Sequence, residues 1–190
     1  MAKFTSRDIA AIAICGALWA VLGATIGPIF WSLTHLPFLC DMIGATVLIL
    51  ALWWIRKLGA ITATGIIATI LTLIIRPQSV HFLGFTAASV VFDILARGVG
   101  YRNSLDRPLM STASLILISM ISTATAGVII GLLFMRPTML VMIGGLYVFS
   151  GLHAIGGLIG SVIGVALIRA LSTRIVLPHT EKNVSSTERV

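Results

Sequence analysis

The chain has 190 residues, of which 58% are hydrophobic and only 10% charged, and its formal net charge is +7. Soluble domains carry about a quarter charged residues, so this composition excludes an ordinary soluble domain and predicts an all-α, polytopic membrane protein. The long apolar runs do not alternate with polar residues as the strands of a membrane barrel would. The basic residues sit in short segments between apolar runs, so the positive charge indicates membrane orientation and not nucleic-acid binding.

The apolar runs predict six transmembrane helices in one bundle, which forms a single domain over residues 1–177. We expect the spans at residues 8–26, 38–55, 59–75, 80–96, 109–135 and 148–171. Residues 27–37 and 97–108 should be loops, and residues 139–147 a loop or a short surface helix. The tail, residues 178–190, is polar and is expected to be disordered. The last span carries three glycines spaced four apart, which favour close helix packing: Gly156, Gly160 and Gly164.

The distribution of Lys and Arg predicts how the chain is oriented. An even number of spans puts both termini on one side of the membrane. Of the 13 Lys and Arg residues, only Arg76 and Arg136 fall on the other side. Basic residues accumulate on the cytoplasmic side, so we expect a multi-pass protein of the plasma membrane with both termini in the cytoplasm.

The non-cytoplasmic side gathers aromatic, histidine and single charged residues. This mixture is typical of a pocket that orients a small polar, ring-bearing molecule. The candidate substrate-binding residues are Trp31, His35, Asp41, Arg76, Gln78, His81, Arg136, Tyr147 and His153. Trp31 and Tyr147 could instead be anchors at the membrane interface. Arg76 and Arg136 could instead cap helix C-termini, where a cation is favourable.

Two of these candidates, Asp41 and His153, lie inside predicted spans. Ionisable groups within spans usually face a cavity and have a partner. His35 and Arg76 are candidate partners for Asp41. Asp93 lies near the cytoplasmic end of the fourth span, where an i,i+4 pair with Arg97 would explain it.

Motifs for catalysis, metal binding and ATP hydrolysis are missing from the sequence. There is no H-E-x-x-H and no P-loop, and the four histidines have no metal-ligand spacing. Cys15 and Cys40 lie in apolar runs and are interpreted as small apolar residues. The sequence therefore predicts neither an enzyme nor a metal site nor a cofactor.

The first predicted span carries small residues at three- and four-residue spacing, which puts them on one helical face. Ala13-x-x-x-Ala17 and Gly16-x-x-x-Ala20 are both small-xxx-small pairs. Such a shallow face lets another helix approach closely in lipid. That helix could belong to the chain's own bundle or to another membrane protein.

Four features together give a family resemblance: the six-span layout, the Ala-x-x-x-Ala helix, the outer ligand site and the missing energy-coupling motif. The chain resembles the substrate-binding S component of an energy-coupling factor (ECF) transporter. The resemblance implies that the face formed by Ala13, Gly16, Ala17 and Ala20 docks on a transmembrane coupling subunit. Two cytoplasmic ATPase subunits would complete this transporter. It also implies a mechanism in which the subunit captures a vitamin-like substrate outside and then topples within the membrane.

A narrower resemblance covers IRKLGAITATGIIA, residues 55–68. This stretch is similar to the Ile-Arg-Lys-Pro-Gly-Ala segment and following helix of the thiamine/hydroxymethylpyrimidine type of S component, with Leu58 in place of the proline. The resemblance implies thiamine or its pyrimidine precursor as substrate. The N-terminal His-containing motif of the nickel and cobalt type is missing, which argues against a metal substrate.

Two other functions are compatible with the same sequence. A small secondary transporter could use a proton gradient through Asp41, His153 and Asp93. A membrane assembly subunit without a ligand would explain the small-residue faces of the first and last spans.

Overall fold

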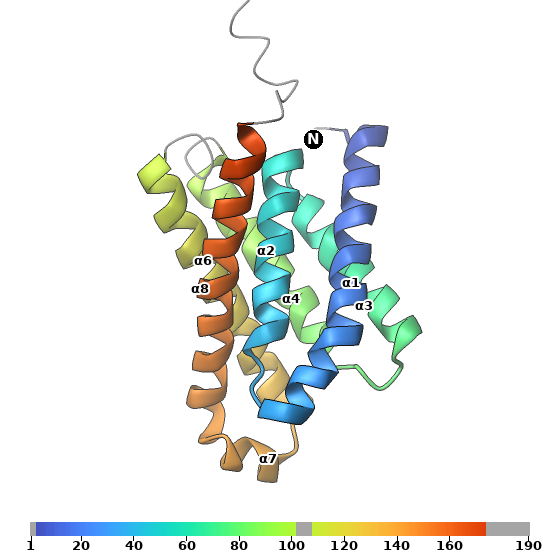
Figure 1. Cartoon of the computed structure of the whole chain (residues 1–190), viewed down its shortest axis with the longest axis vertical. Coiled ribbons are helices and arrows are strands. Elements are labelled where there is room, and N and C mark those ends of the chain that lie inside the picture. The colour runs from blue at the N-terminus through green and yellow to red at the C-terminus, as the bar shows by residue number, and fades with distance from the viewer. Residues whose placement is uncertain (1–2, 102–107, 174–190) are drawn as a thin grey trace, which may run out of the picture.

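The fold is a bundle of helices that lie side by side along one axis (Figure 1). The computed structural model describes residues 3–101 and 108–173, with only the backbone of residues 108–111. Its helices are α1 (Ser6–Thr34), α2 (Phe38–Ile55), α3 (Ala60–Ile75), α4 (Phe82–Val99), α6 (Pro108–Leu133), α7 (Pro137–Met142) and α8 (Gly145–Ser172). The described residues contain no strand, so the predicted all-helical class is confirmed.

Five of the described helices are long and apolar enough to cross a membrane, namely α1, α2, α4, α6 and α8. The third predicted span is present as α3, which is apolar but has only 16 residues. At 1.5 Å per residue such a helix is about 24 Å long, whereas the hydrocarbon core of a bilayer is about 30 Å thick. The structure therefore shows a multi-pass helical chain with five candidate spans and one shorter apolar helix.

The first helix is longer than predicted. We expected a loop over residues 27–37, but α1 continues to Thr34 with Pro28 inside it. Proline has no N–H, so the carbonyl of Ala24 loses its partner within the helix. The guanidinium of Arg76 donates to that carbonyl instead, with Nη1 lying 3.4 Å from the oxygen. Figure 1 shows α1 bending toward its C-terminal end.

The ends of the bundle differ in structure. Residues 139–147 were expected to form a loop or a short surface helix. The structure has the short helix α7 at Pro137–Met142, which buries none of its residues, and α8 already begins at Gly145. Figure 1 places α7 at one end of the bundle and the first turn of α1 and the last turn of α8 at the other. Part of the predicted loop (residues 102–107) and the predicted tail (residues 178–190) lie outside the described residues.

The glycine stripe of α8 packs closely against α2, as predicted. A Cβ atom on Gly160 would lie 2.8 Å from the Cα of Met42, and one on Gly164 would lie 3.1 Å from the Cβ of Ile49. The Thr46 hydroxyl donates to the carbonyl of Gly160 at 2.9 Å. These backbone approaches fix α8 on α2, which matters because each helix carries one of the two ionisable residues described below.

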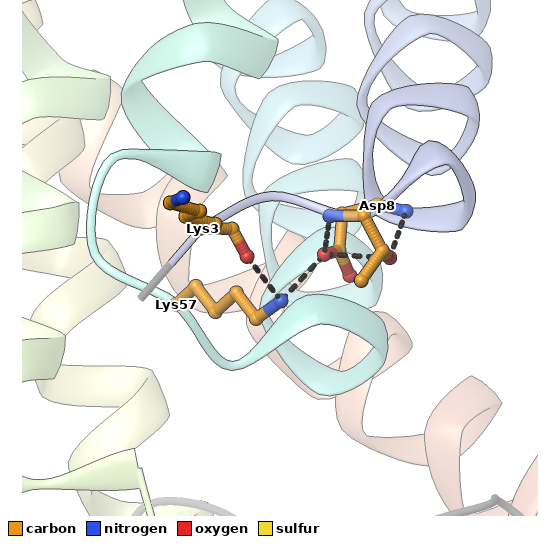
Figure 2. A network of polar contacts seen from close by, with 4 residues as sticks. Lys3, Asp8 and Lys57 are labelled. Atoms are coloured by element: carbon orange, nitrogen blue, oxygen red, sulfur yellow. Dashed lines mark hydrogen bonds and ion pairs between the residues drawn. The ribbon is translucent and has the colours of Figure 1, made fainter. Parts of the chain in front are cut away.

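At the other end of the bundle, a polar network ties the start of α1 to the α2–α3 connection (Figure 2). Thr5 and Asp8 form a capping box at the N-terminus of α1. The ammonium of Lys57 lies 2.6 Å from Oδ2 of Asp8 and donates to the carbonyl of Lys3 at 3.0 Å. The start of α1 is therefore held by Lys57, which lies 49 positions from Asp8 and 54 from Lys3.

The start of α3 is capped from α4. Its N-cap, Gly59, provides no side chain, and Oδ2 of Asp93 accepts from the backbone N–H of Gly59 at 2.8 Å and of Thr62 at 3.2 Å. The same oxygen accepts from the Thr62 hydroxyl at 3.0 Å. The expected pair between Asp93 and Arg97 is therefore wrong, because the carboxylate is used at a helix N-terminus, where a negative charge is favourable.

Candidate ligand-binding site

A cavity of about 310 Å³ lies toward the end of the bundle that carries the α1–α2, α3–α4 and α6–α7 connections, as its lining residues show. This volume is near the lower limit for small-molecule sites, which are roughly 300–1,000 Å³. Its lining comes from α1, the start of α2, the α3–α4 connection, α4, α6 with the residues after it, and α8. The lining residues are Gly23, Gly27, Pro28, Trp31, Pro37, Cys40, Arg76, Gln78, Ser79, His81, Phe82, Phe85, Ile130, Phe134, Met135, Phe149 and His153.

Two glycines of α1 border the cavity, at positions where α1 packs closely against its neighbours. A Cβ atom on Gly23 would lie 2.8 Å from the ring of Phe82, and one on Gly27 would lie 3.0 Å from the sulfur of Cys40. Any larger residue would displace these neighbours. The two glycines therefore let α1 approach α2 and α4 closely at the level of the cavity.

Aromatic rings form much of the remaining wall. Phe82 and Phe85 on α4 have ring centroids 5.2 Å apart, and Phe149 on α8 lies 4.7 Å from the ring of His153. Phe85 also approaches His153, at 6.1 Å. Trp31 completes the aromatic set from α1. A wall of this kind favours a flat ring, which buries a large apolar area and can contact other rings edge to face.

Behind this wall, Asp41 of α2 and His153 of α8 form a buried pair. Their Oδ2 and Nδ1 atoms are 2.7 Å apart, and the side chains are 0% and 2% exposed. These atoms make no hydrogen bond of good angular geometry, so the pair is described by the short distance between them. Gly156 makes it possible, since a Cβ atom there would lie 2.7 Å from the Cβ of Asp41.

The α3–α4 connection supplies polar groups to the cavity. Arg76 is half-buried at the end of α3. His81 immediately precedes α4, and its ring lies 5.5 Å from that of Phe82. Burial lowers the pKa of His81 to about 4, and the nearby His153 and Arg76 act in the same direction. His81 is therefore neutral at pH 7 and offers one N–H donor and one acceptor nitrogen.

The structure brings together part of the predicted site. Five predicted residues line the cavity: Trp31, Arg76, Gln78, His81 and His153. Asp41 does not line it, and its partner is His153 and not His35 or Arg76 as expected. His35, Arg136 and Tyr147 lie on the exposed surface, with Tyr147 93% exposed, so the structure separates these three from the cavity.

Sequence reasoning missed the phenylalanines of the cavity wall. Phe149 precedes His153 by four residues, and Phe85 follows His81 by four, so each shares a helical face or its extension with a predicted residue. That spacing was a usable signal. Within an apolar run, however, phenylalanine is also the residue expected to face lipid.

The predicted docking face of α1 is divided between inside and outside. Gly16 and Ala20 are buried, and a Cβ atom on Gly16 would lie 2.7 Å from Cγ2 of Ile67 on α3. Ala13 is exposed and Ala17 half-buried. Of the four predicted docking residues, Gly16 and Ala20 are therefore packed within the bundle, and only Ala13 and Ala17 remain at least partly exposed.

Comparison with protein-family models, with curated proteins and with solved structures finds no match to this chain. Within residues 3–101 and 112–173, no group of three His, Cys, Asp or Glu side chains could hold a metal ion. The cavity and its polar residues are therefore the features from which a function can be argued.

Proposed function

We propose that the chain is the substrate-capture subunit, or S component, of an ECF-type importer for a vitamin or related small heterocycle. The observation that carries this proposal is the aromatic-lined cavity at the α7 end of the bundle. The distribution of Lys and Arg along the sequence supports an external position for this end in the proposed six-span topology, because only Arg76 and Arg136 of the 13 fall in its predicted outer segments. A capture site belongs at that end.

In this proposal the chain binds and does not catalyse. A transmembrane coupling subunit docks on the small, outward-facing residues Ala13 and Ala17 of α1, and two ATPase subunits supply the energy. The resemblance over residues 55–68 makes thiamine and its pyrimidine precursor the first substrates to test.

A proton-coupled secondary transporter is the second candidate, and the buried Asp41–His153 pair is the observation that favours it. That function needs a proton path through the rest of the bundle. Asp93, the residue that would continue the path, instead accepts three hydrogen bonds at the start of α3. An assembly subunit without a ligand leaves the cavity unexplained. Support is therefore greatest for the S component.

Reconstitution distinguishes these functions. The purified chain in proteoliposomes should bind substrate without ATP and without a pH gradient, but should not accumulate it. Uptake should begin only when a coupling subunit and ATP-hydrolysing subunits are added. Accumulation by the chain alone, driven by an imposed pH gradient and abolished by Asp41→Asn, would instead establish the secondary transporter.

A further inference from the structure

We infer that the cavity takes a ring compound that is neutral or anionic, holds its acceptor or anionic group against Arg76, and discriminates against cations. This inference rests on the proposed capture function and specifies the charge class of the substrate. Of the two substrates named above, it favours the neutral pyrimidine precursor over thiamine, which carries a positive charge.

The first support is that no carboxylate lines the cavity among the described residues. Asp8 pairs with Lys57 at the other end of the bundle, and Asp93 caps α3. Asp41 is fully buried behind His153, which it contacts. The other acidic residues of the chain lie outside the described residues: Asp106, Glu181 and Glu188.

The second support is the guanidinium of Arg76, which lines the cavity with most of its donors available. It carries five N–H groups. The structure gives it one hydrogen bond, the long contact at 3.4 Å to the carbonyl that Pro28 leaves free on Ala24. That contact anchors the side chain at the cavity. Because a planar guanidinium can bind a carboxylate through two parallel hydrogen bonds, Arg76 suits an anionic or carbonyl group.

The third support is His153, a buried polar side chain that borders the cavity without a hydrogen-bond partner. It is 2% exposed, and Nε2, like Nδ1, has no partner in hydrogen-bonding geometry. Since Nδ1 lies against Asp41, Nε2 is on the other side of the ring. A buried polar atom without a partner is costly, so a ligand that bonds to it gains affinity.

The walls supply the ring-binding part of the site. Phe82, Phe85 and Phe149 line the cavity with Trp31. Aromatic faces attract cations by about 0.5–2 kcal/mol, so the discrimination against a cation is assigned to the like charge of the Arg76 guanidinium and not to the walls. His81 is neutral at pH 7 and adds no carboxylate-like partner.

Three probes with one ring and three charges test this inference: pyridine-3-carboxylate, pyridine-3-carboxamide and 3-(aminomethyl)pyridine. Their affinities for the full chain in nanodiscs at pH 7 are measured by calorimetry. The carboxylate should bind at least about tenfold more tightly than the ammonium compound, as expected for a hydrogen bond to a charged group. Arg76→Gln should remove that difference, and Arg76→Lys should retain part of it. Arg136→Gln is the matched control, because Arg136 is exposed and does not line the cavity.

The outcomes separate this inference from the proposed function. If the ammonium probe binds most tightly, or all three bind equally, the charge inference is overturned while the capture function stands. If a folded chain binds none of the three, the cavity is not a ring-binding site and both fail. If Arg76→Gln does not fold, the ranking of the three probes on the parent chain still decides the question.

Discussion

The buried pair of Asp41 and His153 should contribute to stability only as a pair. Its atoms are 2.7 Å apart with almost no solvent exposure, so removing one partner leaves an uncompensated polar group in the bundle. Breaking such a pair costs about 3–5 kcal/mol, whereas replacing both partners by apolar residues of similar volume is often neutral or stabilising. We therefore expect Asp41→Leu and His153→Phe each to destabilise the chain by roughly 3 kcal/mol. The double variant should be much closer to the parent.

The test is a double-mutant cycle. The free energy of unfolding is measured for the parent, both single variants and the double variant by titrating SDS into mixed micelles and following helix content. With each single variant costing roughly 3 kcal/mol, a double variant less destabilised than either one requires a coupling energy above about 3 kcal/mol, at the upper end of what directly contacting residues show. The double variant is the folding control, because it leaves neither polar group unpaired and His153→Phe places a ring beside Phe85 and Phe149, which border His153. Additive effects would refute the reasoning.

Three further outcomes are expected. Ala13→Leu should prevent co-purification with the coupling subunit and leave ligand affinity unchanged, whereas Ala113→Leu, at an exposed position on α6, should change neither co-purification nor affinity. Normal assembly of the first variant would exclude docking at this face. A phosphatase or fluorescent reporter fused after Arg174 should report a cytoplasmic C-terminus, and an external one would reverse the topology. The pKa of His81 is lowered to about 4 in the folded chain, so the unfolded chain takes up a proton at this side chain first as the pH falls. The free energy of unfolding should therefore fall as the pH drops from about 6.5 to 4, and less steeply in His81→Gln.

The helices could be predicted from the apolar runs because the membrane requires every backbone group to be bonded within its own segment. The prediction for α2, residues 38–55, matches the helix exactly as it is bounded in the structure. The end of α1 was missed because Gly27 and Pro28 usually mark a turn. The helix continues because Arg76, 52 residues from Ala24, donates to the carbonyl that Pro28 leaves free, and no local pattern encodes that contact.

For the site, the sequence could predict at which end of the bundle residues lie, but not on which face of its helix each residue lies. Arg76, His81 and His153 were expected at the outer end and do line the cavity. Tyr147 was expected there too, but it is 93% exposed. Successive residues of a helix are rotated by about 100° around its axis. In a uniformly apolar segment, composition alone therefore does not show which face points into the bundle. The same limit explains why Gly16 was assigned to a docking face although it packs against α3.

The use of charged groups differs between the two ends of the bundle, and this difference has a functional meaning. At the end where α1 begins, Asp8 binds Lys57 and Asp93 caps α3, so both carboxylates hold helix termini together. At the cavity end, Arg76 has one long hydrogen bond and His153 has none. Groups already used in holding the fold have little to offer a ligand. Hydrogen-bonding capacity left unused around an apolar cavity, such as the remaining donors of Arg76 and Nε2 of His153, gains most when a ligand supplies a partner, which is why binding should occur at the α7 end.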